Sequence, residues 1–379
     1  MGANISTQQN RPRLQRMLTF LDRDPKNLNL LAECVQLSAE IGDNEQADAL
    51  LVRHQSLTAL PPSLVNLKGA IALATERYAD AAEAFEQLRS GGHNNPAVRF
   101  NLAWAKAMLG TYEEALELLD PETISVSPRA PSLKIQMLHH LKRYDDGLAA
   151  GEELLAAYPD DKALLGALAT LALDAERSDL ARAYAGRGGN NPESQAALGI
   201  LTLGEQNPSD ALVLFDSAIQ QQPRNPRAWI GRGLAQQALG EPAAAAEALD
   251  HGAALFGDHL GSWIAAGWGH VVAGDTASAR ARFEKAMTID PNFSENHGGL
   301  AVLDLMAGDV ASAERRADIA LRLDRSSFGG ALAKSLLLDR TGNAQAAQRV
   351  RQIALNTPIG PAGQTIAEAM ARFGRTSRK

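Results

Sequence analysis

The chain has 379 residues, 45% hydrophobic and 21% charged, which is typical of a folded protein rather than a disordered one. Acidic residues outnumber basic residues by 44 to 37, giving a net charge of −7, so we expect no nucleic-acid partner. The single cysteine, Cys34, excludes an intramolecular disulfide and a cysteine-built zinc site. No apolar run reaches the roughly 18 residues of a membrane span, and the stretch from Met17 to Leu21 is too short for a signal peptide. These features predict a cytoplasmic protein without membrane insertion, and the excess of Arg over Lys is typical of a GC-rich bacterial genome.

The N-terminal segment differs in composition from the rest of the chain. Residues 1–10 are polar and are predicted to be disordered. Residues 11–27 are predicted to form a capping helix, because Arg11 to Leu21 has amphipathic spacing. Residues 1–6 also match the pattern for N-myristoylation, but a pattern this short usually arises by chance and does not establish acylation.

From residue 28 onward the sequence repeats itself about every 34 residues. One position of the period holds alanine in nine copies and Gly147 in the tenth, and the position twelve residues earlier holds Gly, Ala or Ser in eight of ten copies. Small residues at two fixed points allow two helices to approach closely. The first series consists of Ala47, Ala81, Ala115, Gly147, Ala181, Ala211, Ala245, Ala279, Ala313 and Ala347.

A break separates these two small positions in most copies. It reads Gly110-Thr111 in one copy and Gly274-Asp275 in another. Glycine ends a helix in the left-handed conformation at little cost, and Asp or Thr can accept the free N–H groups of the next helix. No segment alternates polar and apolar residues over strand length, so each unit is predicted to be two helices joined by a tight turn.

The unit resembles the tetratricopeptide repeat. The copy that starts near residue 260 has this family's small, aromatic and proline positions, namely Trp263, Gly267, Gly274, Ala279, Phe283, Ala286 and Pro291. The resemblance implies an all-α, right-handed superhelical solenoid of antiparallel helix pairs over residues 28–360. About ten repeats are expected, beginning near Leu28, Pro62, Pro96, Pro128, Lys162, Pro192, Pro226, Leu260, Ser294 and Phe328.

Some copies depart from the pattern. The first has His54 at the second alanine position, and the fourth has Ile135 and Gly151 where Gly and a large apolar residue are expected. The third repeat is two residues short near Pro121, and the fifth is four residues short. The Gly/Asn-rich segment 186–192 then predicts a change of pitch or a hinge, with an ordinary loop as the alternative. Residues 361–379 are expected to form a C-terminal capping helix, Thr365–Phe373, and a basic tail.

The resemblance also implies that the first helix of each repeat lines a concave groove. At the groove positions the sequence becomes apolar from the sixth repeat onward, and a further patch occurs in the third. Such a stripe is typical of an interaction surface, although packing between the first helices is the alternative for each residue. The candidate partner-binding residues are Phe100, Trp104, Met108, Ile230, Leu234, Ile264, Trp268, Val302, Leu332 and Leu336.

The sequence contains no recognisable catalytic, phosphate-binding or metal-binding motif. There is no phosphate-binding loop, zinc-protease motif or nucleophile elbow, and Cys34 occupies a normally apolar position. We predict no catalytic residue, no metal site and no cofactor. The repeats also lack the Lys and Asn pair with which relatives grip a terminal carboxylate.

The sequence therefore predicts a non-catalytic scaffold or adaptor that binds a peptide or an amphipathic helix of another protein. A self-assembling homo-oligomer and a chaperone for secreted or membrane clients are the alternatives.

Overall fold

The computed structural model describes the backbone of residues 2–356 and the side chains of residues 10–352. Its described residues form 22 helices and no strand, which confirms the predicted all-α fold of paired helices. The chain divides between Arg177 and Ser178 into two compact units, which we describe separately.

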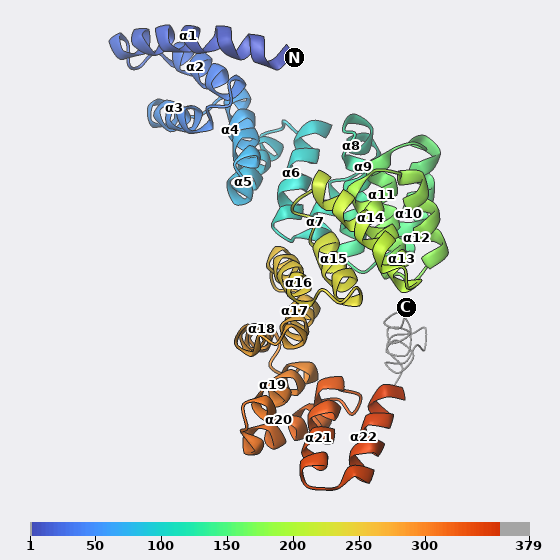
Figure 1. Ribbon diagram of the computed structural model, residues 1–379. Helices are drawn as coiled ribbons and strands as arrows, with labels where there is room; N and C mark the ends of the chain where they lie inside the picture. Colours follow the sequence, from blue (N-terminus) through green and yellow to red (C-terminus); the bar gives the residue numbers. More distant parts are fainter. Residues whose placement is uncertain (1, 357–379) are drawn as a thin grey trace. The chain divides into compact units, whose positions relative to one another are not determined.

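The first unit begins with a single long helix, and pairs of antiparallel helices follow it (Figure 1). Its helices are α1 (Gly2–Arg23), α2 (Leu28–Glu40), α3 (Asn44–Leu57), α4 (Pro62–Ala74), α5 (Tyr78–Ser90), α6 (Pro96–Met108), α7 (Tyr112–Glu117), α8 (Pro121–Val126), α9 (Ala130–His140), α10 (Tyr144–Ala157) and α11 (Lys162–Asp174).

The second unit begins with α12 and continues as five helix pairs (Figure 1). Its helices are α12 (Ser178–Gly188), α13 (Pro192–Gly204), α14 (Pro208–Gln221), α15 (Pro226–Ala238), α16 (Pro242–Phe256), α17 (Leu260–Ala273), α18 (Thr276–Ile289), α19 (Ser294–Met306), α20 (Val310–Leu323), α21 (Phe328–Arg340) and α22 (Ala344–Asn356).

The N-terminal segment differs from the expectation of disorder over residues 1–10. Helix α1 already begins at Gly2 and continues through Pro12 to Arg23. The segment between Ala3 and Asn10 contains neither glycine nor proline, so no residue in it interrupts the helix. At its end the Asn10 amide donates a hydrogen bond to the Glu40 carboxylate of α2, at 3.2 Å.

Side-chain caps and prolines determine where most first helices begin. The Asn95 and Asn225 side-chain oxygens each accept the N–H group three residues later, at 3.0 Å. Pro96 and Pro226 follow these caps, at the helical position where a missing N–H costs nothing. The fourth repeat starts two residues later than the period predicts, at Ala130, because residues 127–130 form a hydrogen-bonded turn.

The two missing residues of the third repeat break its second helix into α7 and α8. Asp120 caps α8 by accepting the Thr123 N–H at 2.7 Å, and Pro121 occupies the first helical position. The second helix of this repeat is therefore replaced by two helices of six residues each.

The tight turns within the repeats use a left-handed residue even where the sequence offers no glycine. Gly110 and Gly274 have φ values of +80° and +81°. In four other repeats a non-glycine residue takes the same conformation, with φ between 57° and 65°. L-residues adopt this conformation at a cost of about 1 kcal/mol, so these turns form despite an unfavourable backbone conformation. These residues are Glu76, Lys142, Glu176 and Gln206.

In several repeats the core forms where a large side chain lies over a glycine of the opposite helix. Phe283 of α18 is fully buried and lies against Gly267 of α17 and Gly299 of α19. Phe215 has the same relation to Gly199 and Gly231. The large residue thereby joins the two helices of its own repeat to the first helix of the next repeat.

The first helices lie on the inner side of each unit. In the second unit α13, α15, α17, α19 and α21 each contact the next member of this row, whereas each second helix packs chiefly on first helices. A stack of pairs curves toward the layer whose members touch each other. The first helices therefore form the inner layer, which is where a groove is expected.

Two predictions concern segments outside this pattern. Residues 186–192, the expected hinge, lie within the second unit, and the division between the units falls earlier, so the hinge stays a prediction. The predicted C-terminal helix Thr365–Phe373 and basic tail lie outside the described residues.

Candidate protein-interaction surface

The candidate residues of the first unit share one face of α6. The ring centroids of Phe100 and Trp104 lie 6.4 Å apart, and both side chains are half-buried. Met108 follows one turn later and is 43% exposed. The structure thus brings these three residues together.

The candidate residues of the second unit differ in accessibility. Ile264 and Val302 are buried in the core, so they leave little surface for a partner. Ile230, Trp268 and Leu332 are half-buried. Leu234 and Leu336 are 41% and 38% exposed.

Two residues outside the predicted set are more exposed than any of these candidates. Val272 and Met306 are each 54% exposed, and they follow Trp268 and Val302 by one helical turn. The spacing of four residues was the signal that could have identified them. We call the resulting set the apolar stripe, and it comprises Leu234, Trp268, Val272, Met306 and Leu336.

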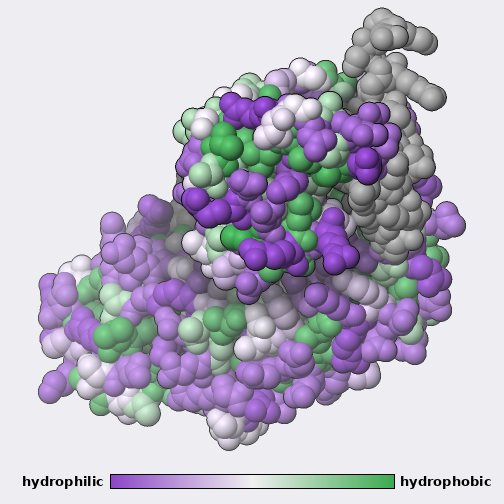
Figure 2. Space-filling view, turned by 90° about the horizontal axis from the view of Figure 1, so that it is seen from below, coloured by the Kyte–Doolittle hydropathy of each residue, from purple (hydrophilic) through white to green (hydrophobic). Residues whose placement is uncertain are grey.

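The apolar stripe lies on α15, α17, α19 and α21, four successive first helices that contact one another in order. Trp268 is fixed by edge-on contacts with Phe283 and Phe328, each with ring centroids 5.5 Å apart. Figure 2 shows one face of the molecule, on which hydrophilic residues are interspersed with smaller hydrophobic areas. Each of these four first helices thus contributes an exposed apolar side chain to the apolar stripe.

The first unit also contains a polar cleft between the first helices α2 and α4. Amide, hydroxyl and carboxylate side chains line it, together with two apolar residues. This cleft follows the same inner layer but has a different chemical character from the apolar stripe. Its lining residues are Gln36, Ala39, Glu40, Ser63, Asn66 and Leu67.

Charged side chains hold neighbouring repeats in register. In the second unit Asp250 of α16 accepts two hydrogen bonds from Arg282 of α18, both at 2.7 Å, and lies 2.9 Å from His270 Nε2 of α17. Burial raises the pKa of Asp250, but the bonds from Arg282 and His270 outweigh that effect and leave the pKa below its usual value. The carboxylate is thus held in its charged form between three helices.

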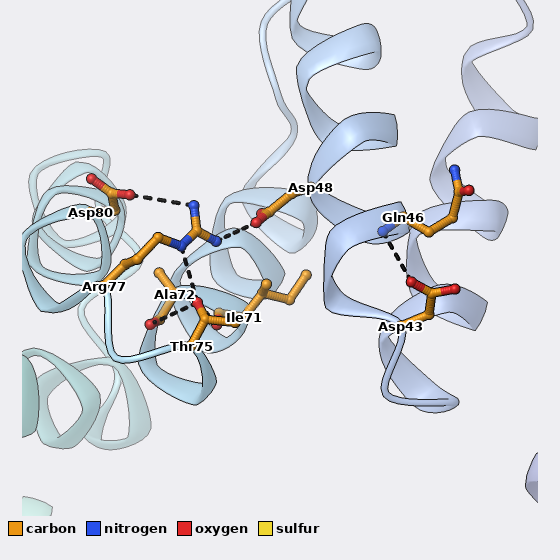
Figure 3. Close-up of polar contacts among 8 residues, drawn as sticks. All are labelled: Asp43, Gln46, Asp48, Ile71, Ala72, Thr75, Arg77 and Asp80. Atoms are coloured by element: carbon orange, nitrogen blue, oxygen red, sulfur yellow. Dashed lines mark hydrogen bonds and ion pairs between the residues drawn. The ribbon is translucent and has the colours of Figure 1, made fainter.

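An equivalent link joins the first two repeats of the first unit (Figure 3). Arg77, which precedes α5, forms ion pairs with Asp48 of α3 and with Asp80 of α5. Its Nε donates to the Thr75 hydroxyl at 3.0 Å, and that hydroxyl donates to the Ile71 carbonyl at 2.8 Å. These links are partly exposed, so each contributes less than about 1 kcal/mol to stability.

The side chains that could act as nucleophiles or metal ligands are buried or paired with other side chains. Cys34 is fully buried, and burial raises the pKa of its thiol. His139 pairs with Asp174 at 2.7 Å, and His140 stacks on Tyr112 with ring centroids 4.5 Å apart. Among the described residues no group of three or more His, Cys, Asp or Glu side chains could hold a metal ion. Within that same part of the chain, no helix has the length and hydropathy to cross a membrane.

Comparison with known proteins bears on the family. A family model described as "Tetratricopeptide repeat" matches residues 72–121, 202–262 and 272–337. No curated protein sequence matches the chain. Among solved structures, the human IFIT1 dimer with m7Gppp-AAAA is 14% identical and covers 92% of this chain and 94% of its own, with a TM-score of 0.52. A monomeric IFIT1 mutant with Gppp-AAAA is 13% identical, covers 86% and 90%, and has a TM-score of 0.51.

These structures correct one prediction from the sequence. IFIT1 holds RNA on the same kind of helical fold, so the fold does not exclude a nucleic-acid partner. The net charge of −7 is also insufficient for that exclusion, because net charge does not describe a local surface. Our expectation that nucleic acid is excluded was therefore wrong.

The 34-residue period, the paired helices and the matched family model agree in three separate parts of the chain. The TM-scores above 0.5 agree with them at the level of the fold. The three matched regions are tetratricopeptide repeats, and the described residues have the fold of a tetratricopeptide repeat solenoid.

Proposed function

We propose that this chain is a non-catalytic scaffold that binds an amphipathic helix of a partner protein on its apolar stripe. Tetratricopeptide repeats generally mediate protein–protein interactions, which supports a protein partner. The observation that carries the proposal is the presence of four exposed apolar side chains and the half-buried Trp268 on four successive first helices.

The chemistry of the stripe favours an apolar helical face as its occupant. Fully burying an aliphatic side chain contributes about 1.5–3 kcal/mol. Leu234, Val272 and Met306 are about half exposed, so covering each of them contributes roughly half of that. Trp268 adds a large anchor whose orientation is already fixed by its ring contacts. An amphipathic helix presents apolar residues at intervals of three and four positions, which matches a row of separate side chains.

The test uses a library of random 16-residue peptides displayed on phage, which is panned on the full chain. We expect enriched peptides with apolar residues at helical spacing. The double variant Val272→Gln/Met306→Gln should weaken their binding at least tenfold, measured by fluorescence anisotropy. These side chains are 54% exposed, so the changes should leave helicity unaltered by circular dichroism.

A matched control is Val213→Gln, because Val213 is 68% exposed on the second helix α14. It should bind the peptides like the unchanged protein. Equal binding by the stripe variant would overturn the proposal. If light scattering instead shows a mass that rises with concentration and falls in the stripe variant, the occupant is a second copy of this chain.

A further inference from the structure

A second surface, in the first unit, combines aromatic rings with a free positive charge. The guanidinium carbon of Arg129 lies 5.7 Å from the ring centroid of Trp104, over its face. Arg129 is exposed and precedes α9, whereas Phe100, Trp104 and Met108 come from α6. We call these four residues the α6 platform.

The polar groups of the platform are donors that lack acceptors. Among the described residues, the Arg129 side chain makes no hydrogen bond or ion pair, and the Trp104 indole N–H has no acceptor. By contrast, the indole N–H of Trp229 donates to the Pro223 carbonyl at 2.8 Å, and that of Trp263 donates to the Gly257 carbonyl at 2.6 Å.

Two carboxylates near the platform already form ion pairs with another arginine. Arg99, also on α6, lies 3.3 Å from Asp120 and pairs with Glu122. Its Nε also donates to the Thr123 hydroxyl at 2.9 Å. Arg129 is thus left without an internal anion, although carboxylates follow closely on α6 in the sequence.

This arrangement fits a ligand that offers an acceptor next to an apolar group. A guanidinium stacked on a ring keeps its N–H edge available and pre-oriented for two hydrogen bonds to one carboxylate. Phe100 and Met108 supply apolar surface beside it. We infer that the α6 platform binds a partner-protein segment in which Asp or Glu adjoins an aromatic or aliphatic residue. The inference rests on the proposed scaffold function and adds a second contact to it.

The basic groups around the α6 platform favour a single carboxylate over a polyanion. Arg99 and Lys106, the basic side chains of α6, are both already paired with carboxylates of this unit. The platform therefore offers one guanidinium, that of Arg129, which matches one carboxylate. A nucleic-acid strand brings a row of phosphates, which needs several basic partners.

The test compares the unchanged full chain with Arg129→Gln. The same phage library is panned on the unchanged chain, with counter-selection on the variant. We expect enriched peptides to carry Asp or Glu beside an apolar residue, and Arg129→Gln to weaken their binding at least tenfold. Changing the peptide carboxylate to its amide should weaken binding equally, and combining both changes should add little. Arg143→Gln, which removes the same charge beyond the other end of α9, should bind within twofold of the unchanged chain.

The other outcomes distinguish failure of this inference from failure of the proposed function. If peptides from the library lose affinity in the Val272→Gln/Met306→Gln variant but the counter-selection yields none that loses affinity in Arg129→Gln, only the α6 platform is overturned. No enriched peptide on any of these proteins would overturn the scaffold proposal itself, and the platform with it. A single-stranded RNA of ten nucleotides that binds through Arg129 and displaces the acidic peptides would overturn the assignment to a protein carboxylate.

Discussion

At the scale of single residues, the core depends on glycines that leave room for a neighbouring ring. A Cβ atom added at Gly299 would lie 2.4 Å from Cζ of Phe283, and one added at Gly267 would lie 2.8 Å from Cε1. Phe283 is fully buried and also contacts Trp268, so the ring has little freedom to move away. These glycines are therefore required for packing rather than for backbone conformation.

We predict that Gly299→Ala destabilises the protein by about 1–3 kcal/mol through overpacking. Gly186→Ala is the matched control, because a Cβ there would meet nothing within 4 Å and α12 should gain up to about 1 kcal/mol from alanine. The measurement is the midpoint of chemical denaturation, which should fall for the first variant and rise for the second. When Phe283→Leu is combined with Gly299→Ala, the smaller side chain should restore part of the lost stability. An unchanged midpoint for Gly299→Ala would contradict the packing argument.

Residue patterns predicted the buried positions better than the exposed ones. The alanines of the period, such as Ala211 and Ala279, are fully buried, as small residues between helices should be. Val302 was selected for the groove but is buried, because α19 and α21 approach so closely that a Cβ on Gly298 would lie 2.4 Å from the backbone nitrogen of Gly330. A single sequence indicates which face of a helix a residue occupies, but not how near the next helix comes.

At the scale of elements, the half-buried carboxylate of Asp250 links α16, α17 and α18. Its pKa is lowered in the folded chain, so the folded state releases this proton more readily than the unfolded state. The resulting stability is present above the unfolded pKa of about 3.9 and is lost as the pH falls through the lower folded value. Arg282 and His270 then lose their anionic partner.

We therefore expect Asp250→Asn to lower the free energy of unfolding at pH 6 and to flatten its dependence on pH between about 5 and 2. Urea denaturation across that range provides the measurement. The control is Asp258→Asn, because Asp258 is 82% exposed and pairs with Lys285 at 3.2 Å on the surface. Parallel pH profiles for the unchanged protein and Asp250→Asn would show that the linkage is absent.

The positions of the helices were largely readable from the sequence, but some turns were not. Proline and asparagine gave the starts of α6 and α15, whereas α8, which begins at Pro121, was not predicted. The turns at Lys142 and Gln206 carry no glycine, so their left-handed conformation is imposed by the helices that they join. Similarly, the sequence did not place Arg129 beside Trp104, because Arg129 lies in the turn before α9 and not at a groove position of a first helix.

At the scale of the whole molecule, the division into units was not predictable from composition. Segment 186–192 is rich in glycine and asparagine, yet its hydrogen bonds tie it to the neighbouring helix. Asn191 caps α13, and the Gln195 amide donates to the Gly189 carbonyl at 2.7 Å. The division between the units falls at Arg177, in a turn without glycine or proline, and the hinge at 186–192 stays a separate prediction. Flexible residue types alone therefore do not locate the boundary of a compact unit.

Repeat arrays transmit a local change only to adjacent repeats, because each repeat packs on its neighbours and on little else. Gly299 lies at the contact between α18 and α19, so Gly299→Ala should weaken protection around that contact first. We predict faster hydrogen exchange in α17–α21 and unchanged exchange in α2–α6, measured by mass spectrometry under native conditions. Gly186→Ala should leave both regions as they are or slow exchange near α12. An increase of similar size in α2–α6 would instead mean that the chain opens as one cooperative body, because the loss at a single contact would then be shared by every repeat.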